Sequence, residues 1–279
     1  MRLHRRPELR HSSGVFRGVY DNFPGLVHVY EPARRTLTAY TGNLVRLRRA
    51  SDDAEADFGY LANGNLDTAA IAAWAAGASY IVTIYDQIGG DNVTQGTAAN
   101  QPLFTAAMLN GRAGAFYDGT NDYLRGAYTT GGALSQPFSA YALAQLDASV
   151  LADASVRFLV DSDDTTNRMA LYKAQAAGVT KWNLYAGAGL VSLTALSTWG
   201  IFSVLLSGVT SALWRNSSLI AGPSNGGAHN ADGITIGDDW AGANPWKGYI
   251  GPIIIVDPAH SDAQRVAMQN SINSFYGAY

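Results

Sequence analysis

The carboxylates, amides and indoles that could do chemistry gather in three short loops of the sequence. A cluster at residues 161–167 reads DSDDTTN, a later loop at 238–247 reads DDWAGANPWK, and a tight turn at 118–122 reads DGTND. Carboxylates in such settings serve in acid–base catalysis, in metal binding or in hydrogen bonds to ligand hydroxyls. The three loops are therefore the candidate sites, although each could also have a purely structural role in a turn between strands.

The acidic cluster is a candidate calcium site. Asp161, Asp163 and Asp164 would supply oxygen ligands from one loop, which is the donor type that calcium prefers. The loop lacks the glycine at its sixth position and the glutamate at its twelfth that an EF-hand loop requires. A solvated acidic turn is the favoured interpretation and calcium binding is the alternative, so no cofactor is expected.

The later loop is a candidate carbohydrate-binding site. Trp240 and Trp246 stand among glycine, asparagine and proline residues, where core packing is a poor explanation for two indoles. Sugar rings stack on indoles, and neighbouring polar side chains accept their hydroxyl protons. The polar partners expected in the two loops are Asp239, Asn244, Asp118, Asn121 and Asp122. The alternative is that the loop folds back and buries both indoles.

Short apolar runs with glycine, asparagine and aspartate turns predict an all-β fold. The chain has 279 residues, 30 of them glycine, and only 15% are charged, which is typical of one well-buried sandwich. Little helix separates the expected strands, so an antiparallel β-sandwich is favoured over a βαβ sheet. The longer expected strands cover residues 41–49, 80–85, 113–117, 123–127, 138–146, 157–160, 169–172, 182–185, 189–196, 200–206, 210–215, 233–237 and 249–256.

Two helices are expected beside these strands. Asp67 is placed to cap a short Ala-rich helix that ends near Gly77. Ser261 and Gln264 form a capping box at the start of a C-terminal helix, whose apolar face would cover one end of the sandwich.

The first 29 residues are expected to form an extended attachment arm, with the sandwich domain at 30–279. Residues 1–50 hold ten arginines against three acidic residues, whereas the rest of the chain is acidic. The first 20 residues show no apolar periodicity, so we expect them to order only against a partner. The arginines of this arm are Arg2, Arg5, Arg6, Arg10 and Arg17.

Several classes of protein are disfavoured by what the sequence lacks. The chain has no cysteine, so neither a disulfide framework nor a thiolate metal site can form. No signal peptide or membrane-spanning stretch is recognisable, and no nucleotide-binding or serine hydrolase motif occurs. We therefore expect a protein made in a reducing cytoplasm, without nucleic acid as a partner and without membrane insertion.

Roughly residues 30 to 279 resemble two groups of proteins. These are the catalytic domain of α-L-arabinofuranosidase B and the concanavalin-like (laminin-G-like) jelly-roll proteins of bacteriophages. The matching motifs are AYTG at 39–42, RLRR at 46–49, GNLD at 64–67, YDQ at 85–87, NGR at 110–112, FYDGTNDYL at 116–124 and IGDD at 236–239. The resemblance implies a concanavalin-like jelly roll and is much less specific about activity.

The resemblance to the arabinofuranosidases also implies a pair of catalytic carboxyl groups. The family uses a glutamate nucleophile in the middle of the domain and an aspartic acid in a late loop, where Asp239 stands in this chain. The only glutamates here are Glu8, Glu31 and Glu55, so the nucleophile has no counterpart. A retaining glycosidase needs both groups, and the candidates to replace the glutamate are Asp161, Asp163 and Asp164.

From these observations the sequence predicts a virion protein and not an enzyme. We expect a phage structural component of the head-spike or tail-fibre type, located on the virion as a homo-oligomer. Its arm would bind other virion proteins, and its jelly roll would bind host-surface polysaccharide. The alternative is an arabinofuranosidase-like glycoside hydrolase with Asp239 as its general acid.

Overall fold

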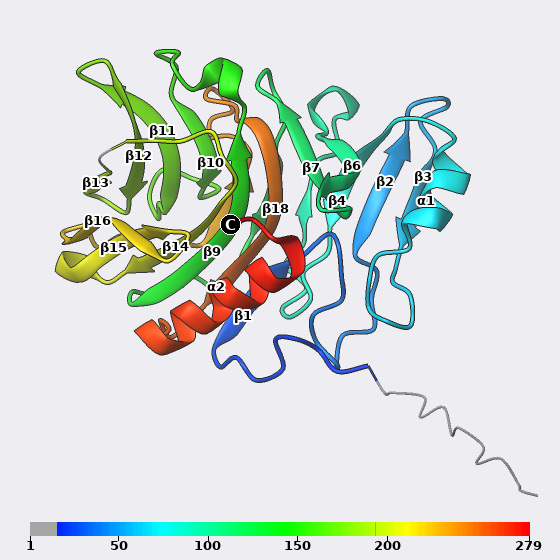
Figure 1. Ribbon diagram of the computed structural model, residues 1–279, viewed down its shortest axis with the longest axis horizontal. Helices are drawn as coiled ribbons and strands as arrows, with labels where there is room; N and C mark the ends of the chain where they lie inside the picture. The colour runs from blue at the N-terminus through cyan, green and yellow to red at the C-terminus, as the bar shows by residue number, and fades with distance from the viewer. Residues whose placement is uncertain (1–15, 193) are drawn as a thin grey trace, which may run out of the picture.

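The computed structural model describes residues 16–192 and 194–279 and contains an antiparallel β-sandwich built from one continuous hydrogen-bonded network of 18 strands (Figure 1). The expected fold class is confirmed. Each layer contains strands that alternate between inward apolar and outward side chains, which is why the sequence showed so many short apolar runs.

The front layer follows the pairing order β3, β2, β4, β6, β7, β18, β9, β14, β15, β16, and β1 pairs with the second half of β18. Its strands are β1 Leu26–Tyr30, β2 Val45–Arg49, β3 Glu55–Phe58, β4 Ser79–Ile84, β6 Leu103–Leu109, β7 Arg112–Asp118, β9 Phe138–Leu146, β14 Gly200–Leu206, β15 Ser211–Arg215, β16 Ser218–Ser224 and β18 Lys247–Val256. β18 is the central strand, because it pairs with β1, β7 and β9.

The back layer follows the order β5, β8, β17, β10, β11, β12, β13, and it joins the front layer where β4 pairs with β5. Its strands are β5 Val93–Thr94, β8 Leu124–Ala127, β10 Arg157–Asp161, β11 Ala170–Ala176, β12 Val179–Tyr185, β13 Gly189–Val191 and β17 Gly233–Ile236. Single-turn 3₁₀ segments occur at Ala98–Asn100, Ala148–Val150 and Gly208–Thr210.

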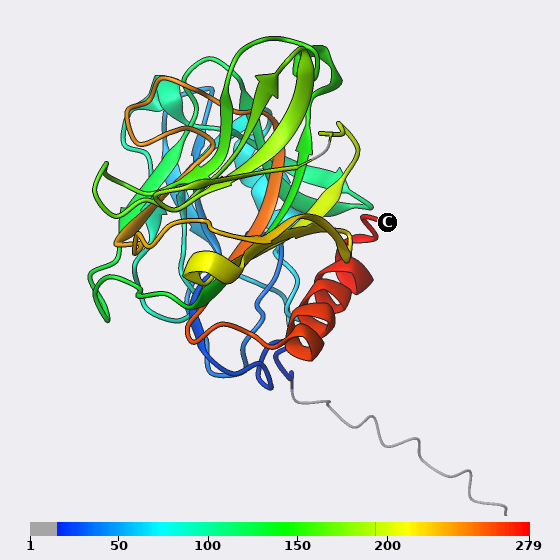
Figure 2. The ribbon, with the colours of Figure 1, turned by 90° about the vertical axis from the view of Figure 1, so that its left-hand side faces the viewer.

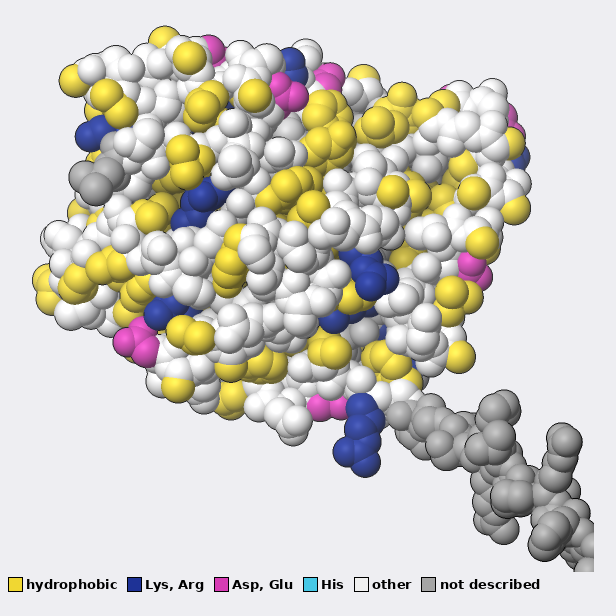
Figure 3. Space-filling model, in the orientation of Figure 1, with side chains coloured by type: hydrophobic (Ala, Val, Ile, Leu, Met, Phe, Trp, Pro, Cys, Tyr) yellow, Lys and Arg dark blue, Asp and Glu magenta, His cyan; other side chains and the backbone are white. Residues whose placement is uncertain are grey.

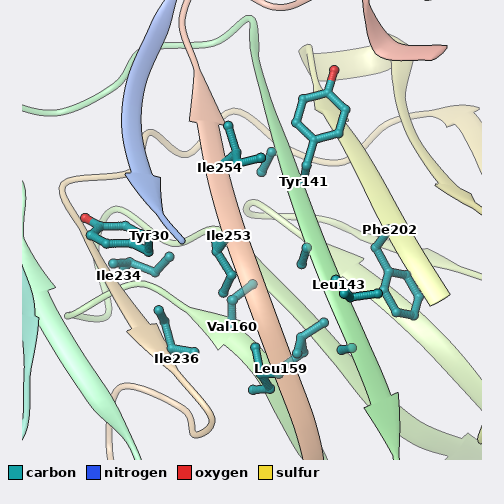
Figure 4. Packing of buried hydrophobic residues seen from close by; sticks show 14 of the residues in the cluster. Tyr30, Tyr141, Leu143, Leu159, Val160, Phe202, Ile234, Ile236, Ile253 and Ile254 are labelled. Atoms are coloured by element: carbon teal, nitrogen blue, oxygen red, sulfur yellow. The ribbon is translucent and has the colours of Figure 1, made fainter. Parts of the chain in front are cut away.

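The core lies between the two layers. Ile253 of β18 packs near Val160 of β10 and Ile236 of β17, and all three are almost fully buried (Figure 4). Burial of such side chains is the main favourable contribution to folding, at about 25 cal/mol per Å² of apolar surface. The alternation of core residues fixes the faces: Ile234 and Ile236 point inward, so Thr235 points outward from the back layer.

Both expected helices are present. α1, Thr68–Ala75, begins at the Asp67 cap and ends at Ala76, which takes the left-handed conformation expected of Gly77. α2, Asp262–Tyr276, starts with the predicted capping box and lies across the outside of the front layer (Figures 1 and 2). Within the described residues, no helix is long and apolar enough to cross a membrane.

The segment expected to be an arm is packed against the sandwich from Tyr20 onward. Tyr20 is fully buried and donates its amide hydrogen to the carbonyl of Thr36, and β1 is paired along its length with β18. Arg17 is exposed, whereas Arg2, Arg5, Arg6 and Arg10 lie outside the described residues. The division at residue 30 thus falls inside a sheet strand, and attachment through an arm stays a prediction.

Candidate functional site

Asp161 ends β10 with its carboxylate held in a buried ion pair. Its side chain is completely buried, and Arg168 binds it through two nitrogens, with Nη2 to Oδ2 at 2.6 Å and Nε to Oδ1 at 2.9 Å. The backbone amide of Ser162 donates to Oδ1 at 2.9 Å, and that of Trp240 donates to Oδ2 at 3.2 Å. Burial raises the pKa of Asp161, and Arg168 opposes that shift.

The loop after β17 carries the two acids Asp238 and Asp239. It opens at Gly237, whose φ of 88° favours glycine and where a Cβ would lie 2.1 Å from the ring of Tyr117. The loop closes where the amide of Trp246 bonds to the carbonyl of Gly237 at 2.8 Å. Both carboxyl groups are therefore held on a short, closed turn.

Asp238 is fully buried and only half satisfied. Its Oδ1 accepts the amide hydrogens of Asp239 and Asn244 at 2.7 and 2.8 Å, whereas Oδ2 has no hydrogen-bond partner within residues 16–192 and 194–279. Burial, with a contribution from the neighbouring Asp239 carboxylate, raises the pKa of Asp238 to about 6. A carboxyl group in this state can carry a proton near neutral pH.

Asp239 is bound within its own loop. Its Oδ1 accepts the amide hydrogen of Ala243 at 2.8 Å, and its Oδ2 accepts the side-chain amide of Asn244 at 2.6 Å. Its charge also contributes to raising the pKa of Arg168, after the larger effect of the Asp161 hydrogen bond. Asp161 therefore binds the Arg168 guanidinium directly, whereas Asp239 acts on it only through its charge.

Arg125 of β8 fixes this loop against the outer face of the back layer. Its Nε donates to the hydroxyl of Thr235 at 2.9 Å, and its Nη2 donates to the carbonyl of Trp240 at 2.6 Å. The Thr235 hydroxyl in turn donates to the carbonyl of Ser162 at 2.8 Å. Side chains from β8 and β17 thus hold the turn after β10 and the loop after β17 together.

Aromatic rings surround the ion pair. Phe158 and Tyr172 stack with centroids 4.6 Å apart, and the guanidinium of Arg168 lies 5.4 Å from the Phe158 ring and 5.7 Å from the Tyr185 ring. Trp240 is 36% exposed beside them. The site therefore combines charged oxygens with apolar ring faces, as ligand sites do.

The structure divides the predicted carbohydrate-binding residues between three places. Trp240, Asp239 and Asn244 share the loop described above. Trp246 is fully buried, with its indole stacked on Trp182 at 5.9 Å, so its expected role as an exposed platform is wrong. The indole turns inward because the backbone bond between Trp246 and Gly237 directs the chain back into β18.

Asp118 and Asp122 line a separate cavity between β7 and β2, on the front layer, and Asn121 belongs to the same turn. The cavity has a volume of about 600 Å³ and is lined by Asp118 and Asp122 together with residues of β2, β4 and β6. The Asn121 side-chain amide bonds to Asn100 at 2.9 Å. These three residues therefore do not contribute to the site around Asp161.

The weak calcium candidates are also separated. Asp161 is bound in an ion pair with Arg168. Asp164 accepts the amide hydrogen of Thr166 at 2.6 Å within its own turn, and Asp163 interacts with the side chain of Asp232. Burial raises the pKa of Asp163, and the nearby Asp232 carboxylate adds to the shift. Over residues 16–192 and 194–279, no group of three or more His, Cys, Asp or Glu side chains is arranged to hold a metal ion.

Sequence reasoning did not identify Arg168, Arg125 or Thr235 as part of the site. Arg168 follows Asp161 by seven residues across the β10–β11 turn, which was the one local signal available. Arg125 and Thr235 come together only through the β8–β17 pairing, 110 residues apart in the chain.

A family model described as "Alpha-L-arabinofuranosidase B, catalytic" matches residues 24–133. No curated protein matches the chain in sequence. Among solved structures, an arabinofuranosidase complexed with arabinofuranosyl-α-1,2-xylobiose is similar with a TM-score of 0.73 and 18% identity, covering 92% of this chain and 64% of that one. A GH54 α-L-arabinofuranosidase soaked with a cyclic sulfate inhibitor gives 0.71 and 16% over the same shares.

These comparisons correct the expected function. The matched family model is a catalytic domain and the similar structures are arabinofuranosidases, which contradicts the predictions of a phage structural protein, of a virion location and of a protein that is not an enzyme. The resemblance to arabinofuranosidase B is confirmed for residues 24–133 and for the fold, and no link to phage proteins is shown. This chain spans 64% of the length of the arabinofuranosidases it resembles.

Proposed function

We propose that this protein is a glycoside hydrolase that removes arabinofuranosyl groups from a polysaccharide. The proposal is carried by one observation: the bond from the Trp240 amide to Asp161 brings the Asp161–Arg168 ion pair against the loop that carries Asp238 and Asp239. The similarity to arabinofuranosidases supports the substrate class. Hydrolysis with retention requires one carboxylate nucleophile and one proton donor on facing sides of the glycosidic bond.

Asp161 is the best candidate for the nucleophile. Arg168 favours its ionised form, and the absence of glutamate beyond residue 55 leaves an aspartate to take this role. The carboxylate would attack the anomeric carbon while the leaving oxygen is protonated, and water would then release the sugar.

The proton donor is proposed to be Asp239, assisted by Asp238. Asp239 stands at the position that the resemblance assigns to the acid, and its charge acts on the guanidinium that binds Asp161. Asp238 lies next to it with one unpartnered oxygen and a pKa of about 6, so it can hold a proton close by. Proton donors of glycosidases have pKa values raised in the same way.

Access to these acids requires the loop to move. Asp161, Asp238 and Asp239 are all buried, and the segment from Trp240 to Ala243 that covers them is exposed. Gly242 in this segment has a φ of 72°, and a Cβ there would meet no atom within 4 Å. We infer that this segment opens to admit the furanose and closes over it, as lids do in many enzymes.

The test is release of 4-nitrophenol from 4-nitrophenyl α-L-arabinofuranoside, together with release of arabinose from arabinan and arabinoxylan. The wild type should release both products, and Asp239→Asn should lose at least about a hundredfold in kcat. Absence of product from all three substrates over a range of pH, from a protein shown to be folded by circular dichroism, would overturn the proposal.

A further inference from the structure

A row of side chains crosses the outer face of the front layer, far from the candidate catalytic site on the back layer. Directly paired residues of six neighbouring strands form it, followed by one residue beside β14. In order they are Arg48, Tyr80, Leu103, Phe116, Tyr249, Gln145 and Trp199. Because directly paired residues share one face of a sheet, this transverse row is continuous, and six strands span roughly 24 Å.

The row faces outward. The residue next to each member in its strand points into the core: Leu47, Ile81, Ala115 and Ile250 are all at most 2% exposed. Tyr80, Leu103, Phe116, Tyr249, Gln145 and Trp199 are instead partly exposed. Hydrophobic side chains are visible over the upper part of β18 in the space-filling view (Figure 3).

Helix α2 leaves the transverse row uncovered. The helix contacts β7 at Arg112, whose Nε donates to the carbonyl of Phe275 at 3.3 Å and whose guanidinium lies 4.1 Å from the Phe275 ring. Gly114 and Phe116 follow on the same face of β7, and Met108 fills the space over Gly114. The row thus begins where the cover provided by α2 and Met108 ends.

One half of the row presents aromatic rings. Phe116 and Tyr249 lie with centroids 5.0 Å apart, and Tyr249 and Trp199 with centroids 5.8 Å apart. Three neighbouring, partly exposed rings on a rigid sheet are suited to the apolar faces of consecutive sugar rings.

The other half leads into the cavity of about 600 Å³, to which Arg48, Tyr80, Leu103 and Phe116 all contribute. Gln101, Asp118 and Asp122 add polar groups to its wall. Asp122 is 6% exposed, and burial, with the nearby Asp118 carboxylate, raises its pKa to about 7. This volume falls in the range of small-molecule sites.

The charges in the cavity disfavour an anionic ligand. Arg48 is already paired, through Nη1 with Asp53 at 2.6 Å and through Nε with Gln101 at 2.6 Å. The remaining ionisable groups on the wall are the carboxyls of Asp118 and Asp122, which would repel an anion. A neutral polysaccharide chain can stack on the aromatic rings and form hydrogen bonds with the polar groups of the cavity, and it brings no charge that would need a partner.

We propose that the transverse row and its cavity bind a neutral polysaccharide chain, at a site separate from the candidate catalytic acids. This assignment does not depend on the proposed hydrolase activity, because the two sites lie on opposite layers and share no side chain.

Affinity electrophoresis in gels that contain neutral arabinoxylan tests the proposal, with polygalacturonate gels for comparison. The wild type should be retarded in the neutral gel only. Tyr249→Ala and Trp199→Ala should each weaken binding about tenfold, as expected for loss of a stacked ring. Asp239→Asn should bind as the wild type does, whatever its activity.

Trp214→Ala is the matched control, since Trp214 is also a partly exposed indole on the front layer but lies on β15, beside Arg265 of α2. It should leave retardation unchanged. Tyr249→Leu and Trp199→Leu keep apolar volume and serve if an alanine variant does not fold.

Three outcomes would overturn the assignment. They are no retardation of the wild type in any neutral polysaccharide, equal retardation of the row variants and the control, or a change of oligomeric state in the row variants by sedimentation. The last result would make the row a contact between copies of this chain.

Discussion

The carboxylate of Asp161 accepts a hydrogen bond from the backbone amide of Trp240, although 79 residues separate them in the chain. This bond joins the turn after β10 to the loop after β17, and Arg168 binds the first of the two acids of the proposed reaction. The bond is thus a direct link between the proposed nucleophile and the segment that covers it.

Asp161→Asn should abolish turnover while the fold is retained. The amide is nearly isosteric and can still accept from Trp240, but it is a poor nucleophile, so kcat should fall by about a thousandfold or more. Asp163→Asn is the control, because Asp163 faces Asp232 and not the loop. Equal loss in both variants, measured with the aryl arabinofuranoside, would argue against Asp161 as the nucleophile.

Trp246→Ala should destabilise the protein strongly, by about 3–5 kcal/mol, because it removes a fully buried indole that is stacked on Trp182. Trp240→Ala should change stability by less than about 1 kcal/mol, since Trp240 is partly exposed. Urea unfolding followed by circular dichroism measures both. Similar values for the two variants would contradict the assignment of Trp246 to the core.

Asp122→Asn should stabilise the protein at alkaline pH and have little effect under acidic conditions. The folded-state pKa of about 7 lies above the ordinary value near 3.9, so the folded chain keeps a proton that the unfolded chain has released between these values. The contribution of protonated Asp122 to the free energy of unfolding is therefore fully present below pH 4 and is lost as the pH rises through 7.

The asparagine variant avoids that loss, so its free energy of unfolding should exceed the wild-type value by roughly 1–3 kcal/mol at pH 8 and match it at pH 4. Asp262→Asn, which removes an exposed carboxylate from the first turn of α2, should give no gain at pH 8. Urea titrations at the two pH values distinguish these cases.

Tyr276→Phe should loosen the end of α2. The Tyr276 hydroxyl donates to Oε1 of Glu31 at 2.5 Å, and Glu31 is completely buried, with a pKa raised by that burial. Loss of the donor leaves a buried carboxylate short of a partner and should cost about 1–3 kcal/mol. Faster removal of the C-terminal helix by limited proteolysis is the expected sign, whereas Tyr279→Phe should resist cleavage as the wild type does.

Local sequence signals predicted the fold well where the strand and helix periodicity was strong. β9 and β14 have the expected bounds, and the capping box of α2 is formed as predicted. β3, β6 and β16 were not predicted. The first is acidic and the last contains Pro223, so both resemble loops, and their strand character comes from pairing with neighbours.

The candidate sites were less predictable because they depend on pairing between distant strands. The acids at 161 and 239 were each noticed, but the spacing of seven residues was the only local signal for the Asp161–Arg168 ion pair, and nothing local links that pair to the loop of Asp239. The glycine- and proline-rich setting of Trp246 suggested exposure, while the backbone turns its indole inward. The transverse row takes one residue from each strand, so it has no contiguous motif at all.

The central position of β18 has a consequence for how the chain must be made. β18 is the last strand of the sequence, yet β1, β7 and β9 all pair with it. During synthesis these three strands leave the ribosome with edges that stay unpaired until residues 247–256 have been made. Nascent chains of this kind expose strand edges that can aggregate, so stalled translation or premature termination before residue 247 should yield insoluble fragments in place of a smaller folded protein.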